Sequence, residues 1–252
     1  MAYVMIFDFR VFLGRSFDGV QQTVGELLRR MDTLAIDMAL VCPLKPASYD
    51  LDLANATLAA CIEDHADRLL GAARVDPWQP DAPESLRRAL ETHGLRAVFL
   101  NPWEECFQAE MSRLDPLMDV AARHKVPILI ASGYPWLSES LQVCALARRW
   151  PDVPVVMSNG GQINISGLGQ ADAALALRRA HNLHVDTAGV YRQDFIEGTV
   201  QEMGAERVLF ASGAPYLDQR YEVKRVLWAD VDDSARRAMQ SGNARLLLGL
   251  DR

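Results

Sequence analysis

Short apolar runs alternate with amphipathic stretches along the whole chain, and this alternation restricts the fold more than any other feature. The runs are continuously apolar, which is typical of parallel strands that are covered by helices on both faces. Eight of these runs are predicted to be strands: 3–9, 36–42, 68–75, 96–100, 126–131, 153–157, 183–187 and 207–211.

The stretches between the strands have the periodicity of helices. Apolar Leu27, Leu28, Met31 and Leu34 recur at helical spacing, so that they share one face. Proline near the start and glycine at the end mark a helix over 82–93. The predicted helices are 19–33, 52–65, 82–93, 113–124, 136–150, 169–180, 192–203, 217–229 and 232–241.

Eight strand–helix units predict an α/β fold in which a parallel sheet closes into a single (β/α)8 TIM barrel. A doubly wound open sheet is the alternative, and the count of eight favours the barrel. No linker, low-complexity run or break in composition divides the chain, so residues 1–252 are predicted to form one domain. The tail 242–250 is expected to pack back onto the barrel.

The charge and the apolar content exclude several classes of partner. The chain carries 33 acidic and 26 basic residues and no basic block, which disfavours nucleic acid and anionic membrane surfaces. No apolar run reaches the roughly 18–20 residues of a membrane-spanning helix, and no secretory signal is evident. The four cysteines are scattered, as expected for reduced thiols in a cytoplasmic protein.

In a barrel of this kind the active site lies at the carboxyl ends of the strands. The side chains at these ends are therefore the candidates for function. They are Asp8, Arg10 and Phe12, Cys42 and Lys45, Arg74 and Asp76, Asn101, Trp103, Glu104 and Glu105, Ser132 and Tyr134, Ser158 and Asn159, Asp186, Thr187 and Tyr191, and Ser212, Gly213 and Tyr216.

The histidines are absent from these positions. All five lie at helix ends or just before strands, where they are expected to cap helix C-termini at the opposite end of the barrel. A zinc or iron site of nitrogen and oxygen ligands is hard to build without histidine, so the sequence predicts no metal and no other cofactor. These histidines are His65, His93, His124, His181 and His184.

A series of segments resembles the amidohydrolase-2 family of metal-dependent barrel hydrolases and decarboxylases. The segments follow the family's order over nearly the whole chain. They read IFDFRVFLG, LRAVFLNP, VPILIASGYP, WPDVPVVMSNGG, NLHVDTAGV, GAERVLFASGAP and GNARLLLGL.

The resemblance implies metal ligands that this sequence does not contain. Where the family has two histidines on its first strand, this chain has Arg10 and Phe12. Ala131 and Asn159 take the positions of the histidines of the fifth and sixth strands, and Gly213 that of the aspartate of the eighth. Four of the five replacements cannot bind a metal, and the neutral amide of Asn159 suits hard cations weakly.

Arg10 carries the main functional hypothesis. A guanidinium supplies positive charge and binds a carboxylate or phosphate through two hydrogen bonds, so Arg10 could replace the metal and hold an anionic ligand. The alternative is an internal ion pair with Asp8, Asp186 or Glu104, because a buried guanidinium requires a partner. The two hypotheses are compatible if a ligand displaces the partner.

The candidate catalytic residues are Arg10, Glu104 and Asp186. Glu104 and Glu105 are adjacent, so we expect that they do not both turn inward. Together with Asp186 they allow a hydrolytic site of two carboxylates, as in glycosidases. The predicted ligand-binding residues are Arg10, Asn101, Ser132, Asn159, Tyr191 and Tyr216.

Other rim residues are more readily explained by packing. Cys42, Cys106 and the rim serines lack a histidine base, and Lys45 is the only lysine near them. The glycine-rich segment 158–169 lacks the lysine of a phosphate-binding loop. The rim aromatics either line a shared apolar pocket or serve as ordinary barrel packing. They are Trp103, Tyr134, Trp136, Tyr191 and Tyr216.

Three functional hypotheses follow. The first is a pseudoenzyme: a barrel without the ancestral metal site that binds a small anionic ligand or a protein partner. The second is a metal-independent hydrolase, decarboxylase, lyase or isomerase that uses Arg10 as electrophile and Asp186 or Glu104 as acid and base. The third is a metal-dependent hydrolase with other ligands, which the positions of the histidines oppose. Barrels of this type often self-associate, so a homo-oligomer is also expected, and the fold alone does not establish activity.

Overall fold

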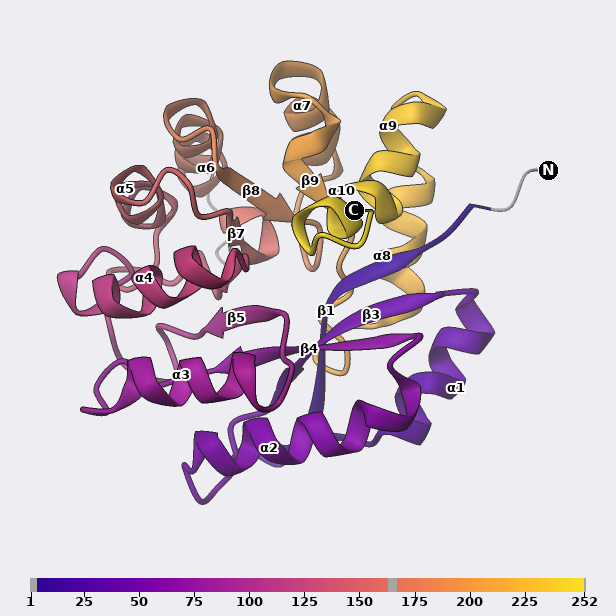
Figure 1. Cartoon of the computed structure of the whole chain (residues 1–252). Coiled ribbons are helices and arrows are strands. Elements are labelled where there is room, and N and C mark those ends of the chain that lie inside the picture. The colour runs from indigo at the N-terminus through magenta and orange to yellow at the C-terminus, as the bar shows by residue number, and fades with distance from the viewer. Residues whose placement is uncertain (1–3, 163–166, 252) are drawn as a thin grey trace.

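A curled parallel sheet forms the centre of the molecule (Figure 1). The computed structural model describes residues 4–162 and 167–251. From β1 onward the strands pair in parallel in the order in which they occur along the chain. They are β1 (Phe7–Arg15), β3 (Met38–Pro43), β4 (Leu69–Arg74), β5 (Ala97–Leu100), β6 (Ile128–Ile130), β7 (Val155–Met157), β8 (Leu183–Asp186) and β9 (Val208–Leu209).

Backbone hydrogen bonds join the two ends of this sheet. Phe9 N–H donates to the Phe210 carbonyl at 2.9 Å, and Gly213 N–H donates to the Arg10 carbonyl at 2.9 Å. The segment that follows β9 therefore lies against β1 and closes the sheet. This closure confirms the predicted (β/α)8 TIM barrel.

Two details of the N-terminal region differ from the prediction. β1 continues to Arg15, so Arg10 and Phe12 lie within the strand and not after it. A register shift between Asp8 and Val11 lets β1 keep pairing with β3 beyond this point. The polar pair Gln21–Gln22 forms β2, a short antiparallel extension of β1, where the prediction had placed the start of a helix.

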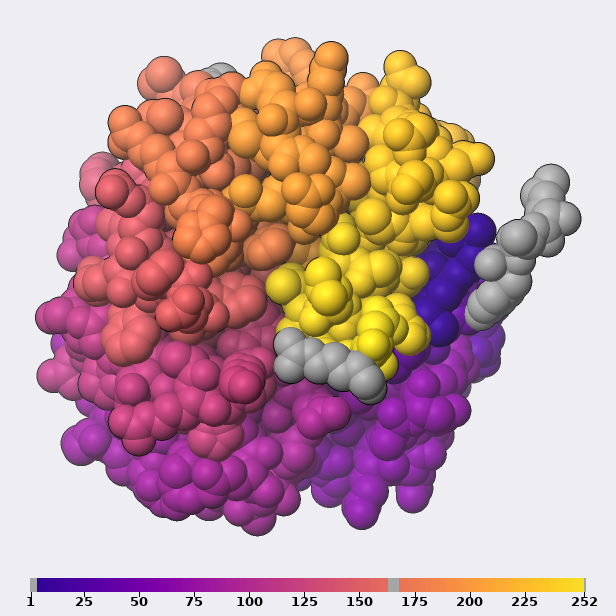
Figure 2. Space-filling view, turned by 45° about the horizontal axis from the view of Figure 1, so that its top comes forward, coloured from indigo at the N-terminus to yellow at the C-terminus, as the bar shows by residue number. Residues whose placement is uncertain are grey.

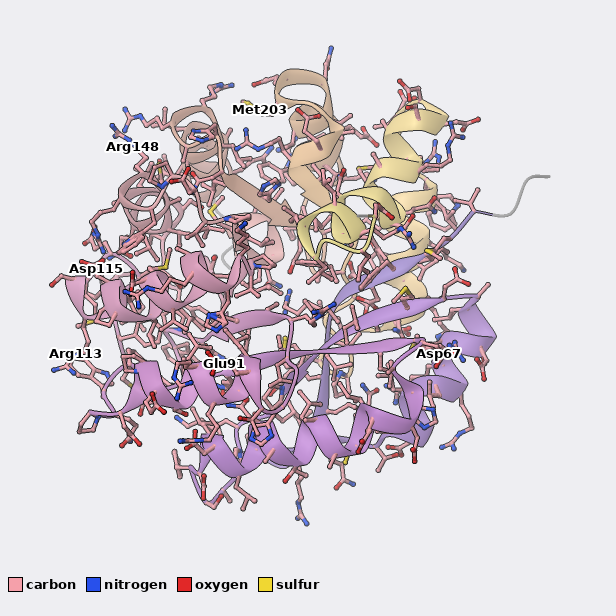
Figure 3. The ribbon with its side chains drawn as sticks, viewed as in Figure 1. Asp67, Glu91, Arg113, Asp115, Arg148 and Met203 are labelled. Atoms are coloured by element: carbon pink, nitrogen blue, oxygen red, sulfur yellow. The ribbon has the colours of Figure 1, made fainter. Side chains whose placement is uncertain are left out.

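The helices surround the sheet, and their charged side chains, such as Arg113, Asp115 and Arg148, lie around the outside (Figures 1 and 3). Local signals fix several helix starts: Thr23 and Glu26 form a capping box at α1, for example. Predicted helix 136–150 begins only at Ser140, because residues 136–139 belong to the loop after β6. The helices are α1 (Val24–Leu34), α2 (Leu51–Ile62), η1 (Glu63–His65), α3 (Ala82–Glu91), η2 (Ser112–Leu114), α4 (Asp115–His124), α5 (Ser140–Arg149), η3 (Ser158–Gly161), α6 (Gly167–Arg179), α7 (Gln193–Met203), η4 (Ala205–Arg207), α8 (Gln219–Leu227), α9 (Asp233–Arg237), η5 (Ala238–Gly242) and α10 (Asn243–Leu247).

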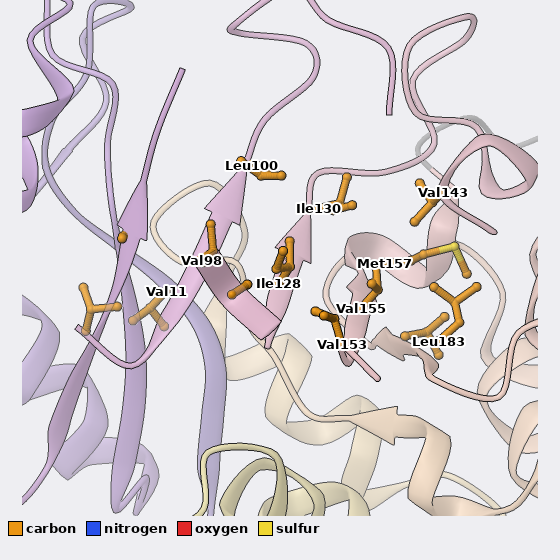
Figure 4. Close-up of a cluster of buried hydrophobic side chains, with 14 of the residues drawn as sticks. Val11, Val98, Leu100, Ile128, Ile130, Val143, Val153, Val155, Met157 and Leu183 are labelled. Carbon is orange, nitrogen blue, oxygen red and sulfur yellow. The ribbon is translucent and has the colours of Figure 1, made fainter. Parts of the chain in front are cut away.

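Two apolar clusters stabilise the barrel. The larger one joins alternate strand residues, including Val98 and Ile128, to the inner faces of the helices (Figure 4). The second consists of the other strand residues, such as Phe7 and Phe99, together with Leu248 of the C-terminal tail. The tail therefore packs onto the barrel as predicted, and Figure 2 shows it in yellow on this face of the molecule. No described helix has both the length and the apolar character needed to cross a membrane.

Candidate functional site

A buried ion pair between β1 and β8 occupies the carboxyl end of the barrel. Arg10 Nε lies 2.6 Å from Asp186 Oδ2, and Arg10 Nη2 lies 3.2 Å from Asp186 Oδ1. Burial is the largest single effect and lowers the pKa of Arg10, but the charge and hydrogen bond of Asp186, together with smaller charge effects from Cys42 and Asp8, outweigh it, so the pKa is raised. Of the three partners considered for Arg10, the structure therefore assigns Asp186.

Asn159 orients this pair from the turn after β7. Its backbone N–H donates to Asp186 Oδ1 at 2.8 Å, and its side-chain Oδ1 accepts from Arg10 Nη2 at 3.3 Å. Its Nδ2 donates to the Ala188 carbonyl at 2.9 Å. These contacts require the left-handed backbone that Asn159 adopts, with φ of 56°. The sequence predicts that Asn159 binds the ligand. In the structure it contacts Arg10 instead, and its side chain holds the guanidinium in place.

One nitrogen of the guanidinium remains unused by this network. Among the described residues, none accepts a hydrogen bond from Arg10 Nη1, whereas Nε and Nη2 are both engaged. A Cβ added at Gly213 would lie only 3.7 Å from Nη1. Glycine therefore keeps a side chain away from Nη1, at the position where the family resemblance implies an aspartate.

Aromatic rings line the barrel next to Arg10. Its guanidinium lies 5.7 Å from the centre of the Phe12 ring, a distance at which cation and ring attract each other. Phe12 in turn meets Phe99 and Tyr216 edge-on, each at 5.4 Å between ring centres. Phe12 and Phe99 both belong to the interior cluster, so Phe12 points inward.

A second buried guanidinium lies on the other side of this aromatic group. Arg74, at the end of β4, lies 5.5 Å from the centre of the Phe99 ring. Its Nη2 contacts Glu104 Oε2 at 2.5 Å and Glu105 Oε1 at 2.7 Å. Lys45 adds a further contact to Glu105 Oε1 at 3.5 Å. The expectation that adjacent Glu104 and Glu105 do not both turn inward is therefore wrong, because buried Arg74 attracts both.

Two aromatic side chains from neighbouring loops stack near these charges. Trp103 and Tyr134 lie 5.3 Å apart with an angle of 8° between their rings. Burial and the Glu104 charge raise the pKa of Tyr134, while Arg10 opposes the shift. Burial and the Glu104 charge also raise the pKa of Tyr216, to about 12. The Glu104 charge therefore raises the pKa of both Tyr134 and Tyr216, so both lie within its electrostatic range at the mouth.

The remaining predicted ligand-binding residues have other surroundings. Ser132 is fully buried, and its hydroxyl donates to the Ile130 carbonyl at 2.7 Å. The Asn101 side chain accepts from Glu104 N–H at 3.3 Å and so shapes the loop after β5. Tyr191 is 62% exposed and makes no hydrogen bond or ring contact with Arg10 within the described part of the chain, so it does not belong to the pair's immediate surroundings.

Of the other rim candidates, Cys42 fits a packing role. Cys42 is buried in the interior cluster, and burial raises its thiol pKa to about 12. Cys106 is exposed, and its thiol faces the Trp103 carbonyl at 3.7 Å. Residues 163–166 of the glycine-rich segment lie outside the described residues. Sequence reasoning missed the role of Arg74. The sequence predicts Arg74 at a strand end, but it does not predict the contacts of Arg74 with the two carboxylates of Glu104 and Glu105.

Two of the histidines have partners away from this pair. His124 lies in the last turn of α4, where its Nδ1 lies 3.1 Å from the Val120 carbonyl and its Nε2 lies 3.1 Å from Glu91 Oε1. His184 lies inside β8 and not at a helix end, so the expectation that it caps a helix is wrong; its Nδ1 lies 3.1 Å from the Glu206 carbonyl. Burial and the Arg207 charge lower the pKa of His184 to about 4.

The side chains at the mouth do not fit the divalent ion that the family resemblance implies. Both oxygens of Asp186 accept hydrogen bonds from Arg10, so an ion bound there would face a guanidinium. The amide oxygen of Asn159 also accepts from Arg10 and from Ser158. Within residues 4–162 and 167–251, no three His, Cys, Asp or Glu side chains form a group that could hold a metal ion.

A separate apolar groove lies outside the barrel. It has a volume of about 810 Å³ and lies between α1 and α2, where its walls include Leu28, Leu44 and Leu58. None of the residues of the Arg10 pair lines this groove. It therefore does not belong to the candidate site.

Solved structures with this fold include several decarboxylases. The 5-carboxyvanillate decarboxylase of Sphingomonas paucimobilis has a TM-score of 0.79 and 14% identity, with 98% of this chain and 99% of that chain covered. The 2,6-dihydroxybenzoate decarboxylase of Rhizobium has a TM-score of 0.78 and 17% identity, with 99% and 100% covered. A dihydroxybenzoic acid decarboxylase of Polaromonas sp. JS666, solved with bound manganese, has a TM-score of 0.78 and 15% identity, with 99% and 98% covered.

None of the curated proteins compared with the chain matches it. The Amidohydro_2 family model, described as amidohydrolase, matches residues 25–250. The matched region begins after β1, so the strand that carries Arg10 and Phe12 lies outside it. The match nevertheless covers most of the chain, which therefore belongs to the amidohydrolase family.

Proposed function

We propose that the mouth of this barrel binds a small aromatic carboxylate without a metal ion, and that Arg10 holds the carboxylate. The observation that carries this proposal is the orientation of the guanidinium. Asp186 and Asn159 engage Nε and Nη2, and no described residue engages Nη1. A hydrogen bond from a charged donor to a carboxylate is among the stronger contacts in proteins, and aromatic rings flank this donor.

The ion pair with Asp186 supports such a role. A buried guanidinium without a counter-ion would carry a large desolvation cost, whereas a paired one can stay in the barrel before the ligand arrives. The pair also fixes the side chain, so that little side-chain entropy is lost when a ligand binds. Arg10 is thus prepared for a ligand that approaches from the side of Gly213.

Decarboxylation without a metal is a second candidate function. The decarboxylases of similar fold are named for aromatic carboxylates, which motivates testing the same ligands here. A guanidinium can stabilise negative charge that develops as a carboxylate reacts. Of the two carboxylates considered as acid or base, Asp186 has both oxygens engaged by Arg10, whereas Arg74 engages only one oxygen of Glu104, which is therefore the more available one.

Calorimetric titration tests the proposal. We expect the protein, purified and titrated in the presence of EDTA, to bind benzoate and 2,6-dihydroxybenzoate. We expect Arg10→Gln to weaken binding at least tenfold, because a charge-assisted hydrogen bond contributes about 1.5–3 kcal/mol. Arg220→Gln is the control, since Arg220 is exposed and pairs with Asp218 on the surface.

Two results would contradict the proposal. The first is binding that requires added manganese or zinc in a stoichiometric amount. The second is an Arg10→Gln protein that binds both acids as tightly as the native protein does. Loss of the 2,6-dihydroxybenzoate absorbance over time in the same EDTA-treated samples would support the decarboxylase candidate.

A further inference from the structure

Among the described residues, the Glu104 side chain near Arg74 carries a second polar atom that has no partner. Glu104 Oε2 contacts Arg74 Nη2, but no described residue donates a hydrogen bond to Glu104 Oε1. The Glu104 side chain is 15% exposed, while that of neighbouring Glu105 is fully buried. Of these two carboxylates, only Glu104 can therefore present an oxygen to a ligand.

A continuous series of contacts connects the two unpartnered atoms. Arg10 packs on Phe12, Phe12 on Phe99, and Phe99 on Arg74, which holds Glu104. Two buried phenylalanine rings thus link the side chain that carries the donor, Arg10 Nη1, to the ion pair that carries the acceptor, Glu104 Oε1. Both the Glu104 and the Arg10 charges affect the pKa of Tyr134, in opposite directions.

The second guanidinium does not provide another anion site. Arg74 already contacts the carboxylates of Glu104 and Glu105, and its remaining contact is with the Pro43 carbonyl at 3.3 Å. Its Nε has no partner, but this atom is fully buried and so is out of reach of a ligand. A second carboxylate on the ligand would meet Glu104 and would be repelled.

We propose that the ligand of this mouth is an aromatic acid with one carboxylate and one hydrogen-bond donor, an amine or a hydroxyl, on the far side of its ring. Arg10 Nη1 takes the carboxylate, and Glu104 Oε1 accepts from the donor. Glu104 is then a specificity-determining residue that favours donor-substituted acids and disfavours dicarboxylates. This inference rests on the proposed function, and it adds the chemistry of the second end of the ligand.

Titration of a matched set of ligands tests the inference on the native protein. The set comprises benzoate, 3- and 4-aminobenzoate, and the 1,3- and 1,4-benzenedicarboxylates. We expect at least one aminobenzoate to bind about tenfold more tightly than benzoate, and both dicarboxylates to bind more weakly than benzoate. Equal affinity for benzoate and the aminobenzoates, or tighter binding of a dicarboxylate, would overturn the inference and leave the proposed function intact.

Two variants locate the effect at Glu104. We expect Glu104→Gln to lose the preference for the aminobenzoate and to bind dicarboxylates better, with little change for benzoate. Glu105→Gln is the matched control, because it also removes a carboxylate from Arg74 but lies where no ligand reaches. The inference fails if both variants change the preference equally. If the native protein binds none of the acids, the proposed function fails and the inference fails with it.

Discussion

A guanidinium in the interior of a barrel needs a counter-ion, and this requirement links Arg10 to a residue 176 positions away. The sequence predicts the need for a partner and restricts it to three acidic residues. Which of these three residues pairs with Arg10 depends on the register of β1 and on the position of β8. Only the closed barrel determines this register and this position. Removal of one member of a buried ion pair typically costs about 3–5 kcal/mol, so Asp186 is as important to the fold as to the site.

Gly213 controls access to the free nitrogen of Arg10. We expect Gly213→Asp to abolish binding of benzoate, because the new carboxylate would lie next to Arg10 Nη1 and take the position of the ligand's own carboxylate. Calorimetric titration of the native protein and of folded Gly213→Asp with benzoate measures this effect.

The control for this prediction is Gly213→Ala. Gly213 has φ of 65°, so alanine introduces the same backbone strain, about 1 kcal/mol, but no charge. We expect this variant to melt at a lower temperature and still bind benzoate. Retained benzoate binding in Gly213→Asp would show that the ligand does not use the space beside Gly213.

The turn after β7 shows how one short element organises the site. Asn159, Gly160 and Gly161 all have positive φ, of 56°, 62° and 74°. A Cβ at Gly161 would lie 2.4 Å from Ser140 Oγ, so the turn packs too closely against α5 for any other residue. The tight turn directs the Asn159 N–H and amide oxygen toward Asp186 and Arg10.

Substitutions of Asn159 separate the backbone role of this turn from its role in the site. We expect Asn159→Ala to destabilise the protein by about 1–2 kcal/mol, because alanine is disfavoured at positive φ and the amide contacts are lost. We expect Asn159→Gly to recover about 1 kcal/mol of this loss, since glycine adopts the same backbone without strain. Urea unfolding measures both changes.

The two variants should nevertheless bind ligand alike. Both lack the amide oxygen that contacts Arg10 Nη2, so both should bind benzoate more weakly than the native protein does. Recovery of full affinity in Asn159→Gly would show that only the backbone of the turn matters.

Strand and helix positions follow from the sequence to within a few residues, because a parallel strand covered on both faces reads as one apolar run. The prediction fails where a segment depends on distant partners. Gln21 and Gln22 form a strand only because β1 extends beyond the bulge and offers an edge. Glu104 and Glu105 both turn inward only because Arg74 lies buried beneath them.

At the level of the whole barrel, the seam between β1 and the segment after β9 depends on a buried carboxylate. Asp8 Oδ1 accepts from Ser212 N–H at 2.8 Å, and Oδ2 accepts from Gln219 Nε2 at 2.9 Å. Asp8 thereby joins the first strand to the last loop and to α8. Burial raises its pKa to about 6, although these hydrogen bonds favour the charged form.

Asp8 and His184 are expected to change stability in opposite directions with pH. The pKa of Asp8 rises from 3.8 to about 6 on folding, so its contribution is most favourable at low pH and is lost as pH rises through this window. The pKa of His184 falls from 6.5 to about 4, so its contribution is complete above 6.5 and is lost as pH falls toward 4. Each of these pH-dependent contributions to the unfolding free energy amounts to about 3 kcal/mol. Because they have opposite signs, they largely cancel in the native protein.

Single variants should reveal the two contributions. Relative to the native protein, we expect Asp8→Asn to gain about 3 kcal/mol in unfolding free energy between pH 4 and 6, and His184→Gln to lose about as much between pH 4 and 6.5. Asparagine can still accept from Ser212 N–H, and its amide can donate to Gln219 Oε1, which has no partner in the described structure. Urea titrations at half-unit pH intervals measure both differences. If the plots of unfolding free energy against pH for the native protein and a variant are parallel, the substituted group has the same pKa in the folded and the unfolded chain. Burial in the barrel then does not disfavour the charged form of that group.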